Sequence, residues 1–162
     1  MNTLTIFVLQ FLLSVLVIGL LAKWELTPRL NKLSRHDALF WLTVPHALRH
    51  IGLVFLVPGV VYQPLPDAFA AQAAYGDLAA GLLALTALIA LRSRWAIALP
   101  VVWVFNVVGT VDLINALRQA EAVPDLGATW YIPTFFVPLL LVTHYLSFAR
   151  LLRQQSPALV TQ

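Results

Sequence analysis

Five long apolar segments dominate this chain, and each is long enough to cross a lipid bilayer. A transmembrane helix needs about 20 mostly apolar residues to cross a hydrocarbon core of about 30 Å. The segments that meet this criterion are approximately residues 4–22, 39–61, 70–91, 95–117 and 129–149. They predict an all-α integral membrane protein, a five-helix transmembrane bundle that forms a single domain over residues 1–162.

The composition excludes several other classes of protein. Hydrophobic residues make up 60% of the chain and charged residues 10%, whereas about a quarter of the residues in soluble proteins are charged. Cysteine is absent, which excludes disulfides, thiolate metal sites and cysteine nucleophiles. The net charge of +3 is not arranged as a basic run interleaved with polar residues, so no nucleic-acid partner is expected.

The basic residues between the segments predict an orientation, because cytoplasmic loops retain Lys and Arg during insertion. If the N-terminus is outside, only Arg118 lies in an outer connection, and the cytoplasmic side carries the others: Lys23, Arg29, Lys32, Arg35, Arg92, Arg94, Arg150 and Arg153. The first segment has no positive charge ahead of it and no small-residue cleavage pattern, so it is predicted to be a retained helix. We therefore expect a multi-pass protein of the inner or plasma membrane with a cytoplasmic C-terminus.

Seven polar residues fall within the apolar segments and are the candidate site. They are His46, Arg49, His50, Asp77, Asn106, Asp112 and His144. Ionisable groups at membrane depth cost several kcal/mol unless they are paired or face a wet cavity, so a functional role is the default interpretation. The lipid bilayer is therefore one expected partner, and a ligand within the bundle is another.

Helical geometry predicts which of these residues meet. At about 1.5 Å of rise per residue, His46 and His144 both lie about 7 Å from the midplane on the cytoplasmic side. Asp77 and Asp112 lie in the outer half, within reach of the Arg49 side chain. His46, Arg49 and His50 are spaced i, i+3 and i+4, so on an α-helix they share one face. That face is predicted to turn toward the fourth and fifth segments.

Three functions are compatible with this constellation. The favoured one is a cavity that binds a small lipophilic or amphipathic molecule, with its headgroup at Arg49 and the histidines and its apolar part among Phe and Leu side chains. A second is a b-type haem or metal site, formed by His46 or His50 with His144, or by His46 and His50 alone. A third is a set of structural ties in a subunit of a membrane complex. Whether the protein is an enzyme stays open.

The two aspartates allow two further hypotheses. If Arg49 pairs with only one of them, the other carboxylate can carry a proton and form a relay with His50. Alternatively, Arg49 and Asp77 form a simple ion pair and Asp112 lies at a watery rim.

Small residues in the third segment predict close helix packing. Gly76, Ala80 and Ala84 recur at intervals of four, which places them on one stripe of an α-helix. Such a stripe serves contacts within a chain or between chains, so a homo-oligomer stays open.

In outline the chain resembles the tryptophan-rich sensory or translocator proteins. The likeness lies in the length, the five-helix layout, the tryptophans near segment ends and the last segment from Trp130-Tyr131-Ile132-Pro133 to His144. The resemblance implies binding of porphyrins or sterol-like ligands. The first loop, with Pro28-Arg29-Leu30-Asn31-Lys32, departs from that family's proline- and tryptophan-rich signature, so no functional residue is carried across.

Overall fold

The computed structural model describes residues 1–61 and 65–153, and this part of the chain is helical with no strand. The first two segments contain α1 (Thr3–Leu21), a π-helical turn η1 (Ala22–Leu26), α2 (Thr27–Leu30), α3 (Arg35–Thr43) and the 3₁₀ helix η2 (Val44–Leu56). The remainder contains α4 (Asp67–Arg92), α5 (Ala98–Leu117), η3 (Ala120–Asp125), η4 (Gly127–Trp130), η5 (Ile132–Phe136) and α6 (Val137–Leu152).

The predicted all-α bundle is confirmed in its main feature. Over the described residues, five helical stretches are long and apolar enough to span a membrane: Thr3–Leu30, Arg35–Leu56, Phe69–Arg92, Ala98–Leu117 and Gly127–Leu152. The first stretch is longer than predicted because α1 continues through η1 into α2. The second ends earlier, because the backbone becomes extended at Val57. Residues 62–64 and 154–162 of the predicted single domain lie outside the described residues.

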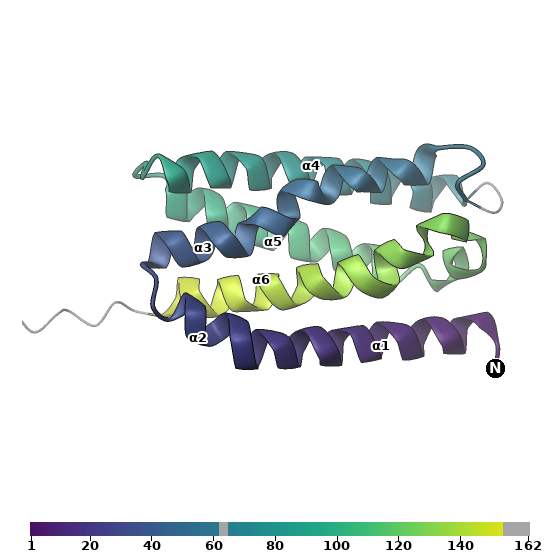
Figure 1. Cartoon of the computed structure of the whole chain (residues 1–162). Coiled ribbons are helices and arrows are strands. Elements are labelled where there is room, and N and C mark those ends of the chain that lie inside the picture. The colour runs from purple at the N-terminus through teal and green to yellow at the C-terminus, as the bar shows by residue number, and fades with distance from the viewer. Residues whose placement is uncertain (62–64, 154–162) are drawn as a thin grey trace, which may run out of the picture.

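The five stretches run side by side along one axis, with α1 at one edge next to α6 (Figure 1). On the other side, α4 packs against η2, α3 and α5. The predicted small-residue stripe lies in this packed region, since Ala80 and Ala84 are fully buried. A Cβ atom added at Gly81 would lie 3.4 Å from the backbone nitrogen of His50. Small side chains therefore let α4 approach the backbone of η2 closely.

The second stretch changes from an α-helix to a 3₁₀ helix at Val44. Pro45 stands at the start of η2, where it removes a backbone donor from the helical ladder. A 3₁₀ helix has three residues per turn, so residues three apart are eclipsed. The buried residues of η2 follow this period and are His46, Arg49, Gly52 and Phe55.

The period of three corrects the expectation that His46, Arg49 and His50 share one face. His46 and Arg49 point into the bundle, whereas His50 is exposed. The spacing i and i+4 joins neighbours on an α-helix, but in a 3₁₀ helix it places the two side chains about a third of a turn apart. His50 accordingly bonds locally, through its Nδ1, with the carbonyl oxygen of Ala47 at 3.1 Å.

Candidate functional site

Arg49 lies at the centre of a buried ion-pair cluster. Its side chain has no exposed surface, although it is a large charged group. Nε donates a hydrogen bond to Oδ1 of Asp77 at 2.7 Å, Nη2 donates to Oδ2 of Asp112, and Nη1 donates to the carbonyl oxygen of Gly109 at 3.1 Å. The guanidinium thus ties η2 to α4 and α5, and the planar fork of donors suits this arrangement.

This geometry confirms the predicted ion pair between Arg49 and Asp77 and corrects the rest of both hypotheses about the aspartates. Arg49 pairs with Asp77 and also with Asp112, so neither carboxylate is left without a positive partner. Asp112 does not stand alone at a rim, because its side chain is only 14% exposed. The estimate of helix depth correctly placed both carboxylates near Arg49, but it carried no information on how one guanidinium divides its donors.

Three glycines provide the space for the cluster, a role that the sequence pattern did not predict. A Cβ atom on Gly52 would lie 2.1 Å from Oδ2 of Asp77, and one on Gly76 would lie 1.8 Å from Oδ1 of Asp112. At Gly109 it would lie 2.9 Å from Nη1 of Arg49. The available signal was their position, since Gly52 follows Arg49 by three residues and Gly76 immediately precedes Asp77.

The two histidines predicted to be level do meet. The ring centroids of His46 and His144 are 4.1 Å apart, and Phe105 of α5 contacts both rings at centroid distances of 4.9 and 5.2 Å. His46 Nε2 lies 2.9 Å from Oγ1 of Thr143. His144 Nδ1 lies 2.8 Å from Oδ1 of Asn106. The histidines therefore connect η2, α5 and α6 next to the ion-pair cluster.

The hydrogen-bond network identifies one ring nitrogen of each histidine as a donor, and the two rings use different nitrogens. Thr143 donates its hydroxyl hydrogen to a carbonyl oxygen of its own helix, so it accepts from Nε2–H of His46. Asn106 donates from its amide nitrogen to the carbonyl oxygen of Val102 at 2.8 Å, so its oxygen accepts from Nδ1–H of His144. The remaining ring nitrogens, Nδ1 of His46 and Nε2 of His144, are buried without a hydrogen-bond partner in the described part of the chain.

The packing bears on the haem and metal hypotheses. At 4.1 Å the rings of His46 and His144 are in direct contact, so a haem between them would require the two helices to separate. His50 faces away from both rings. Among the residues that the structure describes, no group of three or more His, Asp or Glu side chains is arranged to hold a metal ion.

A cavity of about 140 Å³ lies beside the ion-pair cluster. Its walls are mostly apolar and come from α1, η2, α4, α5, η3 and the start of the last stretch, and they include Phe7, Phe55, Phe69 and Ala73. Of the seven predicted site residues, only Asp77 and Asp112 line it. The other five are His46, Arg49, His50, Asn106 and His144, and they do not reach the cavity. The contribution of α1 was not predicted, because its uniform apolar sequence marks no inward face.

The charges at the cavity do not cancel. Arg49 contributes one positive charge and the two aspartates contribute two negative charges, which leaves a net charge of −1 when both carboxylates are ionised. Arg49 is covered by its partners, whereas the side chains of Asp77 and Asp112 keep 13% and 14% of their surface exposed. A molecule in the cavity therefore meets carbon, carboxylate oxygen and the side chain of Gln119.

Comparison with known proteins places the chain in a family. Residues 6–152 match the family model described as Domain of unknown function (DUF8737). The chain belongs to this family. The region shared with DUF8737 contains the whole ion-pair cluster, the histidine pair and nearly all of the cavity wall. No curated protein and no solved structure matches the chain, so the resemblance to the tryptophan-rich sensory proteins rests on outline alone.

Proposed function

We propose that this protein is a multi-pass protein of the inner or plasma membrane that binds a small lipophilic or amphipathic molecule inside its helix bundle. The observation that carries the proposal is the cavity beside Asp77 and Asp112, which combines apolar walls with convergent polar groups. Ligand pockets generally have this composition. A purely structural bundle gains nothing from an unfilled space next to a costly ion-pair cluster.

The arrangement of charges supports an orientation with the N-terminus outside. One end of the bundle is formed by α2, the start of α3, the turn between α4 and α5, and the end of α6 (Figure 1). The eight basic residues of the expected cytoplasmic set belong to this end. Positive charge retained on the cytoplasmic side then places the cavity in the outer half of the membrane.

Single-cysteine labelling tests this orientation, because the natural chain has no cysteine. Asn2→Cys and Ser34→Cys lie at opposite ends of the bundle. In intact cells an impermeant maleimide is expected to label Asn2→Cys, and to label Ser34→Cys only after the membrane is opened. The reverse pattern would contradict the orientation.

The size of the cavity limits the ligand. An engineered cavity of about 150 Å³ in another protein accepts benzene, and pockets for drug-sized molecules are about 300–1,000 Å³. A cavity of about 140 Å³ therefore suits one ring or a short branched chain. A porphyrin or a sterol does not fit without movement of the helices.

Access from the bilayer is provided by α1, which closes one side of the cavity with Leu4, Phe7 and Val8. No residue of α1 is buried, and its contacts are with α6, η5 and η3. Near its outer end, Oε1 of Gln10 accepts a hydrogen bond from Nε1 of Trp130 at 2.6 Å, and Phe7 packs edge-on against the same indole. A small displacement of α1 would admit a molecule from the lipid.

Filling the cavity tests the proposed function. Ala73→Leu adds three carbon atoms to the cavity wall, whereas Ala79→Leu adds the same atoms at an exposed position of the same helix. Toluene is expected to raise the melting temperature of the purified protein and of Ala79→Leu, because a ligand that binds the folded state stabilises it. Ala73→Leu should lose this shift. Equal shifts in all three proteins, or none in any, would contradict the proposal.

A further inference from the structure

We propose that the ligand of this cavity is a cation, namely a small lipophilic amine whose ammonium group lies against Asp77 and Asp112. This inference rests on the proposed function and adds the charge of the ligand to it. It reverses the polarity expected from the sequence, where Arg49 was the residue to meet a headgroup.

The first argument is that Arg49 is closed off from the cavity, although only three of its five N–H groups form hydrogen bonds with the described residues. Its Nε, Nη1 and Nη2 all donate within the cluster, and its side chain has no exposed surface. Both carboxylates line the cavity, whereas the guanidinium does not. An anionic headgroup would therefore meet two like charges, which is unfavourable where little water screens them.

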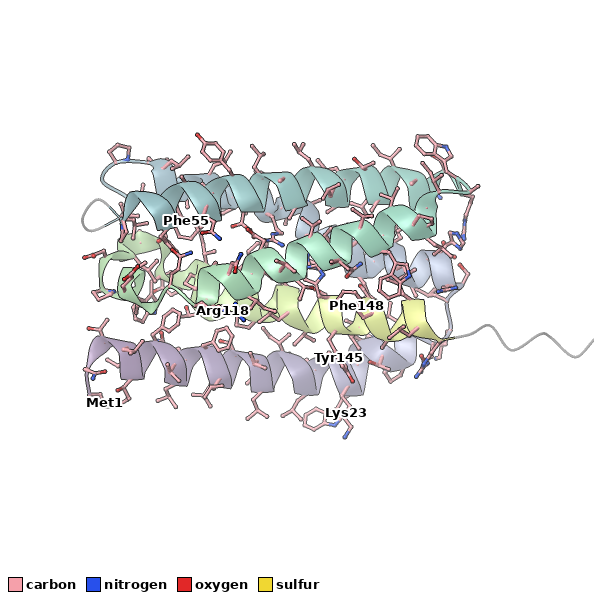
Figure 2. All side chains as sticks on the ribbon, turned by 180° about the vertical axis from the view of Figure 1, so that it is seen from behind. Met1, Lys23, Phe55, Arg118, Tyr145 and Phe148 are labelled. Carbon is pink, nitrogen blue, oxygen red and sulfur yellow. The ribbon has the colours of Figure 1, made fainter. Side chains whose placement is uncertain are left out.

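The second argument is the unbalanced negative charge. The neighbouring histidines, His46 and His144, each have a second ring nitrogen that is buried without a hydrogen-bond partner among the described residues. A proton on that nitrogen would be a buried donor without an acceptor, so the neutral rings add no positive charge. Arg118 lies at the same end of α5 (Figure 2), but it is exposed and forms no ion pair with the residues that the structure describes. Within the described residues the cluster keeps its excess of one negative charge, which a bound cation would neutralise.

The third argument is that each carboxylate has accepting capacity left over. Oδ1 of Asp77 and Oδ2 of Asp112 accept from Arg49, while the second oxygen of each accepts no hydrogen bond from the described residues. The two side chains keep 13% and 14% of their surface exposed, and both line the cavity. An ammonium group has three donors to offer to such oxygens.

The lining of the cavity favours an organic cation over a metal ion. Phe7, Phe55 and Phe69 surround the space above the carboxylates, and the rings of Phe55 and Phe69 meet edge-on at 5.6 Å. Metal ions such as Ca²⁺ require about six to eight oxygen ligands, which these carbon-lined walls do not supply. Aromatic faces attract ammonium groups, and an apolar body fills the remaining space.

Three probes of similar shape test the inference: benzylamine, toluene and benzoate. They share one ring and carry positive, zero and negative charge near pH 7. Binding is measured by ligand-observed NMR in micelles, with Ala73→Leu in the same micelles as the reference for detergent partitioning. Benzylamine is expected to bind at least about tenfold more tightly than toluene, equivalent to about 1.4 kcal/mol, and benzoate should not bind.

Asp112→Asn removes the excess charge and keeps the shape of the side chain. It is expected to bind toluene as the natural protein does, which shows that the cavity is intact, and to lose the tenfold preference for benzylamine. Asp77→Asn provides a second variant with the same expectation if Asp112→Asn does not fold.

The outcomes separate the two proposals. If toluene binds and benzylamine binds no more tightly, the cavity is a binding site but the proposal of a cationic ligand is wrong. A proton on one carboxylate then supplies the missing positive charge. If the preference survives in both Asn variants, the carboxylates do not recognise the amine and the inference fails. If none of the probes binds more strongly to the natural protein than to Ala73→Leu, the proposed function itself fails.

Discussion

The first and second helical stretches differ in where their side chains lie. Helix α1 is mostly apolar and has no buried residue, so most of its side chains face away from the bundle. Helix η2 carries His46 and Arg49 fully buried against α4, α5 and α6. The comparison shows that the most apolar stretch is the least buried, whereas buried polar side chains connect the helices. Bundles in lipid are expected to behave in this way, since acyl chains solvate Leu and Ile as well as a protein core does.

The glycines of the two stretches also differ, in the space that surrounds them. A Cβ atom added at Gly19 of α1 would meet nothing within 4 Å, whereas one added at Gly52 of η2 would overlap the carboxylate of Asp77. Gly19 therefore has room for a larger side chain, whereas Gly52 does not. Substitutions in the two stretches should therefore differ widely in their effect on stability.

The largest effect is expected at Arg49. Arg49→Ala leaves Asp77 and Asp112 buried together without their shared positive partner, and breaking a buried ion pair in this way costs about 3–5 kcal/mol. The measurement is the free energy of unfolding by SDS titration in mixed micelles. Arg118→Ala removes an exposed arginine and is the matched control, with an expected change below about 0.5 kcal/mol.

A compensating variant sharpens this prediction. Replacing the whole cluster with apolar residues, Arg49→Met with Asp77→Leu and Asp112→Leu, removes the uncompensated charges and should recover most of the stability lost in Arg49→Ala. If Arg49→Ala is as stable as the natural protein, the cluster does not hold the helices together and the contrast with α1 is wrong.

The next effect is expected at His46. His46→Ala removes a buried ring that packs on His144 and Phe105, and deletions of this size in packed cores cost about 3 kcal/mol. His50→Ala should change the free energy of unfolding by less than about 0.5 kcal/mol, because that side chain is exposed. Similar losses for the two alanine variants would indicate an α-helix in place of the 3₁₀ helix.

A smaller effect is expected at the glycines. Gly52→Ala forces the carboxylate of Asp77 to move, and overpacking of this kind costs about 1–3 kcal/mol. Gly19→Ala is the matched change in α1, where alanine is favoured over glycine in a helix by about 1 kcal/mol. The same SDS titration should show opposite signs for the two variants, and a loss of stability in Gly19→Ala would mean that α1 packs more closely than described.

The smallest effect is expected on the exposed face of α1. Leu12 is 56% exposed, so Leu12→Ala removes few protein contacts and should change the free energy of unfolding by less than about 0.5 kcal/mol. Leu42→Ala is the control, since Leu42 is buried in a cluster with Leu30 and Ala38, and its expected cost is about 2–5 kcal/mol. Equal costs would show that a partner covers α1.

Part of the candidate site was predictable because helix depth follows directly from residue number. The rise per residue along each segment correctly predicted that His46 lies near His144, and that both aspartates lie near Arg49. The predicted orientation of the His50 side chain was wrong, because the direction in which it points depends on whether the segment is an α-helix or a 3₁₀ helix. Pro45 signalled an interruption of the ladder, but a proline alone does not specify three residues per turn over the thirteen residues of η2.

The sequence by itself determined that five stretches are apolar enough to span a membrane, and which few residues must avoid lipid. Both follow from transfer energies, which depend on composition and length and need no knowledge of neighbours. Only the tertiary structure decided that Arg49 is shared by two carboxylates, that glycines make room for them, and that α1 closes a cavity above them. These features depend on which atoms of different helices come within a few ångströms of each other, and a linear pattern of residues does not encode that distance.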